Sequence, residues 1–245
     1  MNWKAFALAG ILLVASCSSN DDPAVDQVPN ASDISGSVFL YNEGTDRVAS
    51  DGMTVTVANV DPERSAVTDA SGKFVIRNVP LGTHILTFTK NGYGTFKIFD
   101  FAHVTDDRET VLTTIPSLGT SSSTQVTALT ATVAGTEVAI RATTNPAGSA
   151  NNSRYVRIFL HTAANVSQVF HTVYSPTFVA RINPFVKTYT KAELNAMGFV
   201  SGSTVFVRVY GDSYWGNQYK DPGLDRWVFP NLNPNAAAAT SFVVP

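Results

Sequence analysis

Short stretches of alternating apolar and polar residues dominate the first half of the chain. Residues 53–57 alternate strictly, which indicates a strand with one buried and one solvated face. The Asp-Ala-Ser-Gly turn at 69–72 suits a hairpin between 66–68 and 73–77, because Asp can bond its own backbone and Gly accepts positive φ. Seven such strands are predicted within 34–115, and their spacing predicts a two-layer β-sandwich.

The second half repeats this pattern after a Ser/Thr/Gly-rich run at residues 117–124, which we interpret as the linker between two domains. Alternation predicts strands at 129–133, 138–140, 155–160, 170–174, 178–182, 204–210 and 240–244. One short helix is expected to connect the two sheets, since Thr190 and Glu193 form a capping-box pattern and Gly198 supplies the stop. The predicted fold class is therefore all-β, with two β-sandwich domains in tandem.

The only cysteine, Cys17, follows an apolar run at residues 5–14 and two small residues, Ala15 and Ser16. Lys4 precedes this run, which is too short to span a bilayer as a helix, so the pattern is typical of a secretory signal. Residues 14–17, Val-Ala-Ser-Cys, resemble the lipobox of bacterial lipoproteins. The resemblance implies a lipoprotein signal peptide at 1–16 and a diacylglyceryl group on the Cys17 thiol. Two or more acyl chains give a stable membrane anchor.

Residues 17–32 are polar, acidic and proline-containing, so we expect a flexible tether to the first domain. Ser18 follows the cysteine, which in the lipoprotein family favours the outer membrane over retention at the inner membrane. The run 18–22 resembles the acidic surface-export tether of some Gram-negative lipoproteins, although an ordinary linker has a similar composition. The expected location is therefore the outer membrane, on the cell surface or on the periplasmic face.

Five short motifs follow one another through the first half of the chain. They are Gly36-Ser-Val38, Gly52-Met-Thr-Val55, Thr68-Asp-Ala-Ser-Gly-Lys-Phe74, Val79-Pro-Leu-Gly82 and Asn91-Gly-Tyr93. Together they resemble the carboxypeptidase regulatory-like domain, a transthyretin-like β-sandwich, over residues 33–116. The resemblance implies a folding or spacer module without catalytic residues, of the kind that accompanies hydrolases, outer-membrane receptors and surface proteins. His84 departs from the family, which usually has an apolar or aromatic core residue at that position.

The second half, residues 125–245, is loosely similar to a fibronectin type III or immunoglobulin-like sandwich. The similarity rests on residues 205–210, Val-Phe-Val-Arg-Val-Tyr, followed by Gly-Asp, a loop and a last apolar strand. The length of that loop and the inserted helix depart from a standard repeat. The similarity therefore implies a sandwich more firmly than it implies either family.

Motifs for catalysis and for phosphate binding are absent from the sequence. The formal net charge of −2 argues against nucleic acid as a partner. His161 and His171 could meet across paired strands, but two imidazoles without a Cys or carboxylate make a weak zinc site. GxSxG and P-loop motifs do not occur, and no carboxylate pair stands out for glycoside hydrolysis. We therefore expect no catalytic residues, no metal, no cofactor and no enzymatic activity.

Residues 211–230 form the most unusual stretch, because aromatic and polar side chains alternate closely there. The candidate ligand-binding residues are Tyr214, Trp215, Asn217, Tyr219, Asp221 and Trp227. Aromatic faces beside amides and carboxylates suit a sugar ring or a protein partner, and loops of sandwich domains often carry binding residues. Alternatively the loop packs its aromatics on the sandwich as a lid, since large aromatics gain most when buried.

Two hypotheses on function follow from this stretch. A surface lipoprotein that binds polysaccharide or envelope proteins predicts that Trp215 and Trp227 are exposed. A structural component, or an accessory subunit of an outer-membrane complex, predicts that both are buried. A hydrolase is a third hypothesis, which would need convergent acid and base groups that the sequence does not indicate.

Overall fold

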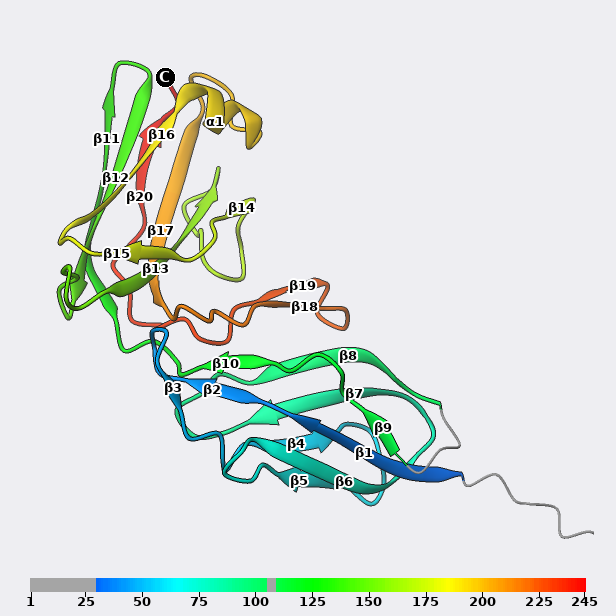
Figure 1. The fold of residues 1–245 in the computed structure, drawn as a ribbon. Coiled ribbons are helices and arrows are strands. Elements are labelled where there is room, and N and C mark those ends of the chain that lie inside the picture. Colours follow the sequence, from blue (N-terminus) through cyan, green and yellow to red (C-terminus); the bar gives the residue numbers. More distant parts are fainter. Residues whose placement is uncertain (1–29, 105–108) are drawn as a thin grey trace, which may run out of the picture.

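The computed structural model describes residues 30–104 and 109–245. These residues form two β-sandwich domains in tandem, which confirms the predicted all-β class (Figure 1). The signal peptide predicted at 1–16, Cys17 and most of the predicted tether lie outside the described residues. Within the described part, no helix is long and apolar enough to cross a membrane.

The first domain consists of two layers of strands. Its strands are β1 (Ala31–Ser37), β2 (Phe39–Tyr41), β3 (Arg47–Val48), β4 (Thr54–Val57), β5 (Arg64–Val67), β6 (Lys73–Pro80), β7 (Gly82–Thr89), β8 (Phe96–His103), β9 (Glu109–Val111) and β10 (Ser117–Gly119). One layer has the order β5-β4-β7-β8. In the other layer, β1 and β2 follow one another along the chain. Strand β1 pairs with β6 (antiparallel) and β9 (parallel), and β2 pairs with β3 (antiparallel) and β10 (parallel).

Local sequence explains much of this domain. Val55 and Val57 of β4 are buried while Thr54 and Thr56 are partly exposed, as the alternation predicts. At the turn into β6, the Asp69 Oδ1 accepts from the backbone N–H of Ser71 (2.8 Å) and Lys73 (3.0 Å). The strands thus bury one face each and meet at turns that the sequence marks.

Strand β7 pairs irregularly with β8. Leu86 and Phe88 are fully buried, and the register between β7 and β8 shifts between His84 and Leu86, where β8 carries one extra residue. His84 lies partly exposed, with its Nε2 2.7 Å from the Pro80 carbonyl oxygen. A bulge inserts one extra residue into a strand, which a simple period of two does not predict.

The second domain packs two further sheets around its own core. Its elements are β11 (Gln125–Ala134), β12 (Glu137–Asn145), β13 (Arg154–His161), β14 (Val173–Tyr174), β15 (Phe178–Ala180), β16 (Phe185–Thr190), α1 (Lys191–Ala196), β17 (Thr204–Asp212), β18 (Tyr219–Asp221), β19 (Arg226–Val228) and β20 (Thr240–Val243). The sheets have the orders β11-β12-β16 and β14-β13-β17-β20, and β15 also pairs with β13. Ile140, Ile158 and Val207 are among the fully buried residues between them.

The short helix α1 confirms its prediction. It connects β16 of one sheet to β17 of the other, at the end of the second domain farthest from the first (Figure 1). Thr190 is the N-cap: its side chain accepts from the Glu193 N–H, and the Glu193 carboxylate accepts from the Thr190 N–H (2.7 Å). Gly198 follows the helix with φ 91°, a left-handed conformation suited to Gly.

Two predicted segments differ from the structure. Residues 117–124, predicted as a linker, begin with β10, which pairs with β2, and end with the fully buried Thr124. The strand predicted at 170–174 is limited to Val173 and Tyr174. The small polar residues of 117–124 are typical of a flexible linker. In the structure, however, their backbone groups form hydrogen bonds with the neighbouring strand and with the second domain.

Candidate functional site

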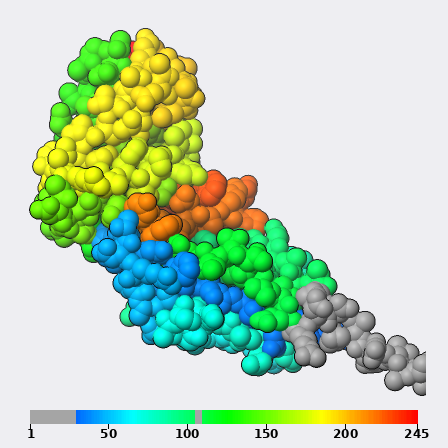
Figure 2. Space-filling model, in the orientation of Figure 1, coloured from blue at the N-terminus to red at the C-terminus, as the bar shows by residue number. Residues whose placement is uncertain are grey.

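Residues 211–232, here called the joint segment, run between the two domains. Figure 1 shows the β18–β19 hairpin extending from the second domain over β8 of the first. In Figure 2 the segment appears in orange between the mostly blue and cyan first domain and the yellow and green second domain. This stretch includes all of the candidate residues predicted from the sequence.

Asn217 binds the free edge of β10 through its side chain. Its Nδ2 donates to the Ser117 carbonyl oxygen (2.7 Å), and its Oδ1 accepts from the Gly119 N–H (3.0 Å). An adjacent strand would pair with these same backbone groups, so the amide takes the place of a strand. Asn217 has φ 52°, a conformation that Asn adopts more readily than most residues.

Asn231 extends this connection. Its Nδ2 donates to the carbonyl oxygen of Trp215 (2.7 Å) and to Oδ1 of Asn217 (2.8 Å), and its Oδ1 accepts from the Gly94 N–H (3.1 Å). Gly94 lies so close that a Cβ there would collide with the carbonyl oxygen of Pro230. The two domains thus approach one another at backbone distance, which only glycine allows at this point.

Aromatic side chains fill much of the contact between the two domains, which is here called the joint. The Tyr219 ring centroid lies 5.9 Å from those of Phe96 and Phe99 in the first domain. Asp221 is almost wholly buried, and its Oδ2 is 3.7 Å from Nζ of Lys97. These aromatic contacts bury apolar area on both domains and so favour one fixed arrangement of the two domains.

A second group of aromatic rings lies nearer the β2–β3 turn. Trp215 packs on Tyr41 of the first domain, with ring centroids 4.9 Å apart. Tyr214 lies edge-on to Trp215 (5.3 Å) and to Tyr155 of the second domain (5.8 Å). Trp215 is partly buried in this stack, whereas Tyr214 is 45% exposed.

Glu43 is the polar centre of the joint. Its carboxylate accepts from the hydroxyls of Ser122, Ser123 and Thr124 (2.6 Å each) and from Nη2 of Arg154 (2.7 Å). Burial alone would raise the pKa of Glu43, but these hydrogen bonds and the charge of Arg154 together lower it below its ordinary value. The carboxylate therefore remains ionised and links the first domain to the second.

The joint segment also covers the outer face of the β13–β17 sheet. Phe229 is buried against Phe159 and Tyr174, with ring centroids 5.0 and 4.9 Å apart. Beneath it Arg157 pairs with Asp212, with 2.8 Å between Nε and Oδ2, and its guanidinium lies 5.1 Å from the Phe229 ring centroid. For Phe229 the alternative of an aromatic lid is therefore the correct one.

Trp227 is placed differently from the other candidates. It is 38% exposed and packs on Tyr174, with ring centroids 5.7 Å apart. Tyr174 contacts His171 (5.5 Å). Burial is the main reason why the pKa of His171 lies below its ordinary value, so this ring is mostly neutral at pH 7.

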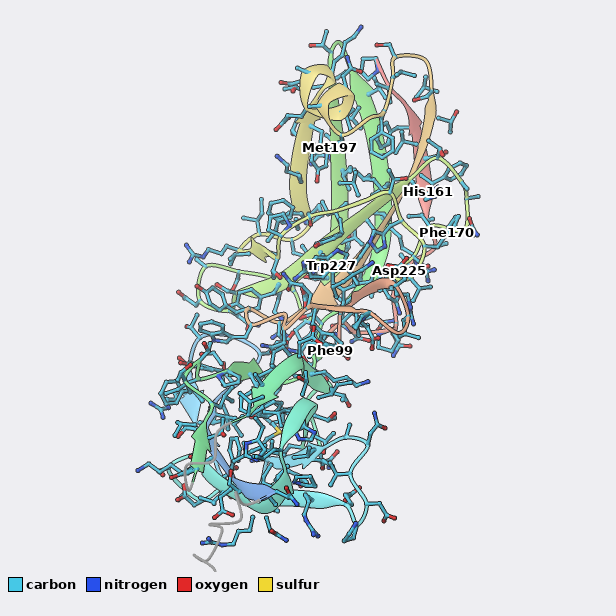
Figure 3. The ribbon with its side chains drawn as sticks, turned by 90° about the vertical axis from the view of Figure 1, so that its right-hand side faces the viewer. Phe99, His161, Phe170, Met197, Asp225 and Trp227 are labelled. Carbon is cyan, nitrogen blue, oxygen red and sulfur yellow. The ribbon has the colours of Figure 1, made fainter. Side chains whose placement is uncertain are left out.

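Further aromatic rings continue this surface. His161 stacks on Phe170, with centroids 4.2 Å apart and planes 24° apart, and Phe170 is 42% exposed. We call the five residues His161, Phe170, His171, Tyr174 and Trp227 the aromatic face. Figure 3 shows Trp227 near the middle of this side of the molecule, with Phe99 below it and Phe170 and His161 above.

Polar side chains border the aromatic face. Lys220 lies opposite Trp227 across the β18–β19 hairpin, and its Nζ is 2.8 Å from Oδ1 of the exposed Asp225. The hydrogen bond from Lys220 and its charge lower the pKa of Asp225, so this carboxylate is ionised. In the described part of the chain, no three His, Cys, Asp or Glu side chains gather as a metal site would require.

The structure thus divides the predicted site residues into two groups. Four of them lie in the joint and contact the first domain: Trp215, Asn217, Tyr219 and Asp221. Tyr214 and Trp227 keep exposed rings, the first packed on Tyr155 and the second on Tyr174. Sequence reasoning missed Glu43, Arg154 and Gly94, because no local motif marks a residue whose partner comes from a distant segment.

Comparison with known proteins agrees with the fold of the first domain. Residues 34–116 match the family model of the carboxypeptidase regulatory-like domain. The predicted resemblance of the first domain is confirmed. The match covers less than half of the chain, so it describes this domain alone. No curated protein matched the sequence.

Three of the solved structures to which the chain is similar illustrate the low TM-scores of these matches. A type II cohesin–X-dockerin complex of Acetivibrio cellulolyticus has 27% identity and a TM-score of 0.31, over 37% of this chain and 59% of that chain, which is less than two thirds of its length. A Bacteroides uniformis protein described provisionally as carbohydrate binding has 14% identity and a TM-score of 0.30, over 88% of this chain and 99% of that chain. A DUF3823 family protein of Parabacteroides merdae has 12% identity and a TM-score of 0.27, over 74% of this chain and 90% of that chain. TM-scores this low carry no information on function.

Proposed function

We propose that this chain is a non-catalytic binding protein of the cell envelope, anchored to the outer membrane through a lipidated Cys17, and that its aromatic face binds polysaccharide. One observation carries the proposal: the half-exposed Trp227 ring is held by Tyr174 beside the charged pair of Lys220 and Asp225. Aromatic rings held in place in this way contact a ligand at little entropic cost, because few side-chain torsions are left to fix.

The chemistry of the aromatic face suits a sugar. The apolar C–H face of a pyranose ring packs on an indole, while its hydroxyls exchange hydrogen bonds with the neighbouring charged groups. The Lys220 ammonium donates and the Asp225 carboxylate accepts, so both roles of a hydroxyl are served. Phe170, stacked on His161, offers a second ring for the next sugar of a chain.

Enzymatic activity is no part of the proposal. General acid catalysis of glycoside cleavage needs a carboxyl group whose pKa is raised, opposite a second carboxylate. The acidic side chain at the aromatic face, Asp225, has a lowered pKa and pairs with Lys220. The regulatory-like first domain then serves as the membrane-proximal spacer, and the joint fixes the direction of the second domain.

The decisive test is binding of the purified full-length protein to an array of polysaccharides. We expect Trp227→Ala to abolish binding, whereas Trp227→Phe retains an aromatic ring and should retain part of it. Val200→Ala removes an apolar side chain that is 67% exposed in the loop between α1 and β17, and serves as the matched control. No binding by the wild type, or unchanged binding by Trp227→Ala, would reject the proposal.

A second candidate is a structural accessory subunit of an envelope complex. The specific observation in its favour is that Trp215, Asn217 and Tyr219 contribute to the joint instead of to an open site. Crosslinking in intact cells, followed by mass spectrometry of the captured proteins, separates the two. A stoichiometric partner protein in the absence of saccharide binding favours the structural role.

The anchor is tested separately. Cys17→Ser removes the thiol that the lipid would alkylate, so the variant should lose incorporation of radiolabelled palmitate and leave the membrane fraction. Ser19→Ala lies two residues away and should leave both properties unchanged. Membrane retention of Cys17→Ser would contradict lipid anchoring.

A further inference from the structure

The two domains line a polar cleft. Figure 1 shows one of its walls, the turn between β2 and β3, at the end of the joint opposite the β18–β19 hairpin. Residues 42–46, the turn between β2 and β3 of the first domain, form one wall. Residues 151–155, at the start of β13, form the other. The cleft is open to solvent and has a volume of about 420 Å³, within the range of small-ligand sites. We propose that this interdomain cleft is a second binding site, specific for uncharged sugar residues.

The first wall is held in shape by its own side chains. Oδ1 of Asn42 accepts from the Gly44 N–H (2.8 Å), and Nδ2 of Asn42 donates to Oδ2 of Asp46 (3.0 Å). A Cβ on Gly44 would lie 3.2 Å from the Tyr155 hydroxyl, so glycine lets the turn come close to the opposite wall. A ligand would therefore meet a preformed turn, which lowers the entropic cost of binding.

The second wall presents free polar groups. Its backbone is fixed by the hydrogen bond from the Asn152 N–H to the Ser149 carbonyl oxygen (3.2 Å), while the side chains of Asn151 and Asn152 are exposed. Tyr155 closes the inner side, with a buried ring that Tyr214 contacts edge-on. The exposed Tyr214 ring thus stands next to the cleft, as an apolar surface beside the polar walls.

Charge decides the class of ligand. Arg154 is the one cation among the residues that line the cleft, and its guanidinium already binds Glu43, Ser123 and Thr124. A phosphate or carboxylate ligand would therefore meet no unpaired cation among these lining residues. The lining is also too polar for an apolar ligand, which would leave the amides without hydrogen bonds.

Amide and hydroxyl side chains match the hydroxyls of a neutral sugar. An Asn side chain donates through its nitrogen and accepts through its oxygen, and a sugar hydroxyl does both as well. Asp46 adds an acceptor at the rim. The inference takes its class of ligand from the proposed function, but its residues, apart from their contact with the joint, are separate from the aromatic face.

The test is an NMR titration of the ¹⁵N-labelled full-length protein with methyl glycosides, maltotriose, cellotriose and xylotriose. The side-chain NH₂ signals of Asn151 and Asn152 report on the cleft, and the indole N–H signal of Trp227 reports on the aromatic face. Asn152→Ala and Trp227→Phe assign the two sets of signals. We expect at least one of these saccharides to shift the Asn152 signals.

The same titration measures affinity in the variants. Asn152→Ala and Tyr155→Phe should each weaken binding at the cleft about fivefold to tenfold, since each removes a hydrogen-bonding group. Asn195→Ala, an exposed asparagine on α1, is the matched control and should leave affinity unchanged.

The outcomes separate the two proposals. Shifts of the Trp227 indole alone would reject the cleft and keep the aromatic face as the site. Shifts of the Asn151 and Asn152 amides alone, with affinity weakened in Tyr155→Phe and, as read from the Asn151 signals, in Asn152→Ala, would support the cleft and reject the face. If neither signal shifts with any of the saccharides, both proposals are rejected.

Discussion

Oε2 of Glu43 in the first domain lies 2.7 Å from Nη2 of Arg154 in the second. The two side chains are only 16% and 12% exposed, and three hydroxyl groups complete the coordination of the carboxylate. An ion pair with this many hydrogen bonds offsets the cost of removing its charges from water. It therefore fixes the first domain relative to the second in a way that an exposed pair would not.

Replacement of Glu43 tests this connection. Glu43→Gln keeps the shape of the side chain but removes the charge, so we expect the free energy of unfolding to fall by about 2 kcal/mol. Urea denaturation followed by tryptophan fluorescence measures the change, because Trp215 lies in the joint. Asp225→Asn removes the exposed partner of Lys220 and should leave the unfolding midpoint unchanged. Equal effects of the two variants would contradict a special role for Glu43.

The same carboxylate predicts a dependence on pH. Its folded pKa is lower than its ordinary value of 4.5, so its contribution to stability is present above that value and is lost as the pH falls through the folded pKa. Thermal unfolding of the wild type and of Glu43→Gln should therefore differ at pH 6 and converge in acid. A difference that is constant from pH 6 to pH 3 would show that ionisation of Glu43 does not stabilise the joint.

Local patterns in the sequence were sufficient for the fold class and for several elements. The Asp69 turn and the Thr190 cap depend on side chains that bond backbone groups within four residues, so their spacing carries the information. Burial of alternate residues likewise marks β4. The β-bulge opposite His84 was not predicted, because its extra residue lies in the neighbouring strand β8 and the sequence of β7 does not mark it.

The joint could not be predicted in the same way. Glu43 and Arg154 are 111 residues apart in the chain, and Asn217 and Gly119 are 98 apart. An aromatic and polar segment is equally suited to a ligand and to a neighbouring domain, since both offer apolar surface and hydrogen-bonding groups. Which of the two occupies it depends on the relative placement of the domains, and this placement left Trp227 exposed while Tyr219 was covered.

The helix cap gives a stability prediction of known size. Thr190→Ala removes the side-chain oxygen that accepts from the Glu193 N–H, so we expect a loss of about 1 kcal/mol. Thr190→Ser keeps the hydroxyl and should cost much less. Urea denaturation of the three proteins measures the difference, and equal stability of the Ala and Ser variants would show that the cap is unimportant here.

Gly94 tests the close approach of the domains. Gly94→Ala places a Cβ against the carbonyl oxygen of Pro230, so the joint must open. We expect a larger radius of gyration in small-angle X-ray scattering and a lower melting temperature. Gly223→Ala is the matched control, because its Cβ would lie 3.4 Å from Oδ1 of Asp221, an ordinary contact. An unchanged scattering profile for Gly94→Ala would mean that the domains are not packed at this point.

Arg157 tests the support beneath the aromatic face. Its Nε and the Oδ2 of Asp212 are 2.8 Å apart, both side chains are at most 2% exposed, and Nη1 and Nη2 donate to the Ser175 carbonyl oxygen and the Thr177 hydroxyl. Arg157→Met leaves the Asp212 carboxylate buried without its cation, so the free energy of unfolding should fall by about 3–5 kcal/mol. The double variant Arg157→Met with Asp212→Asn removes that unpaired charge and should recover part of the loss in urea denaturation. If the double variant is no more stable than Arg157→Met, the loss comes from packing against Phe229 instead of from the unpaired carboxylate.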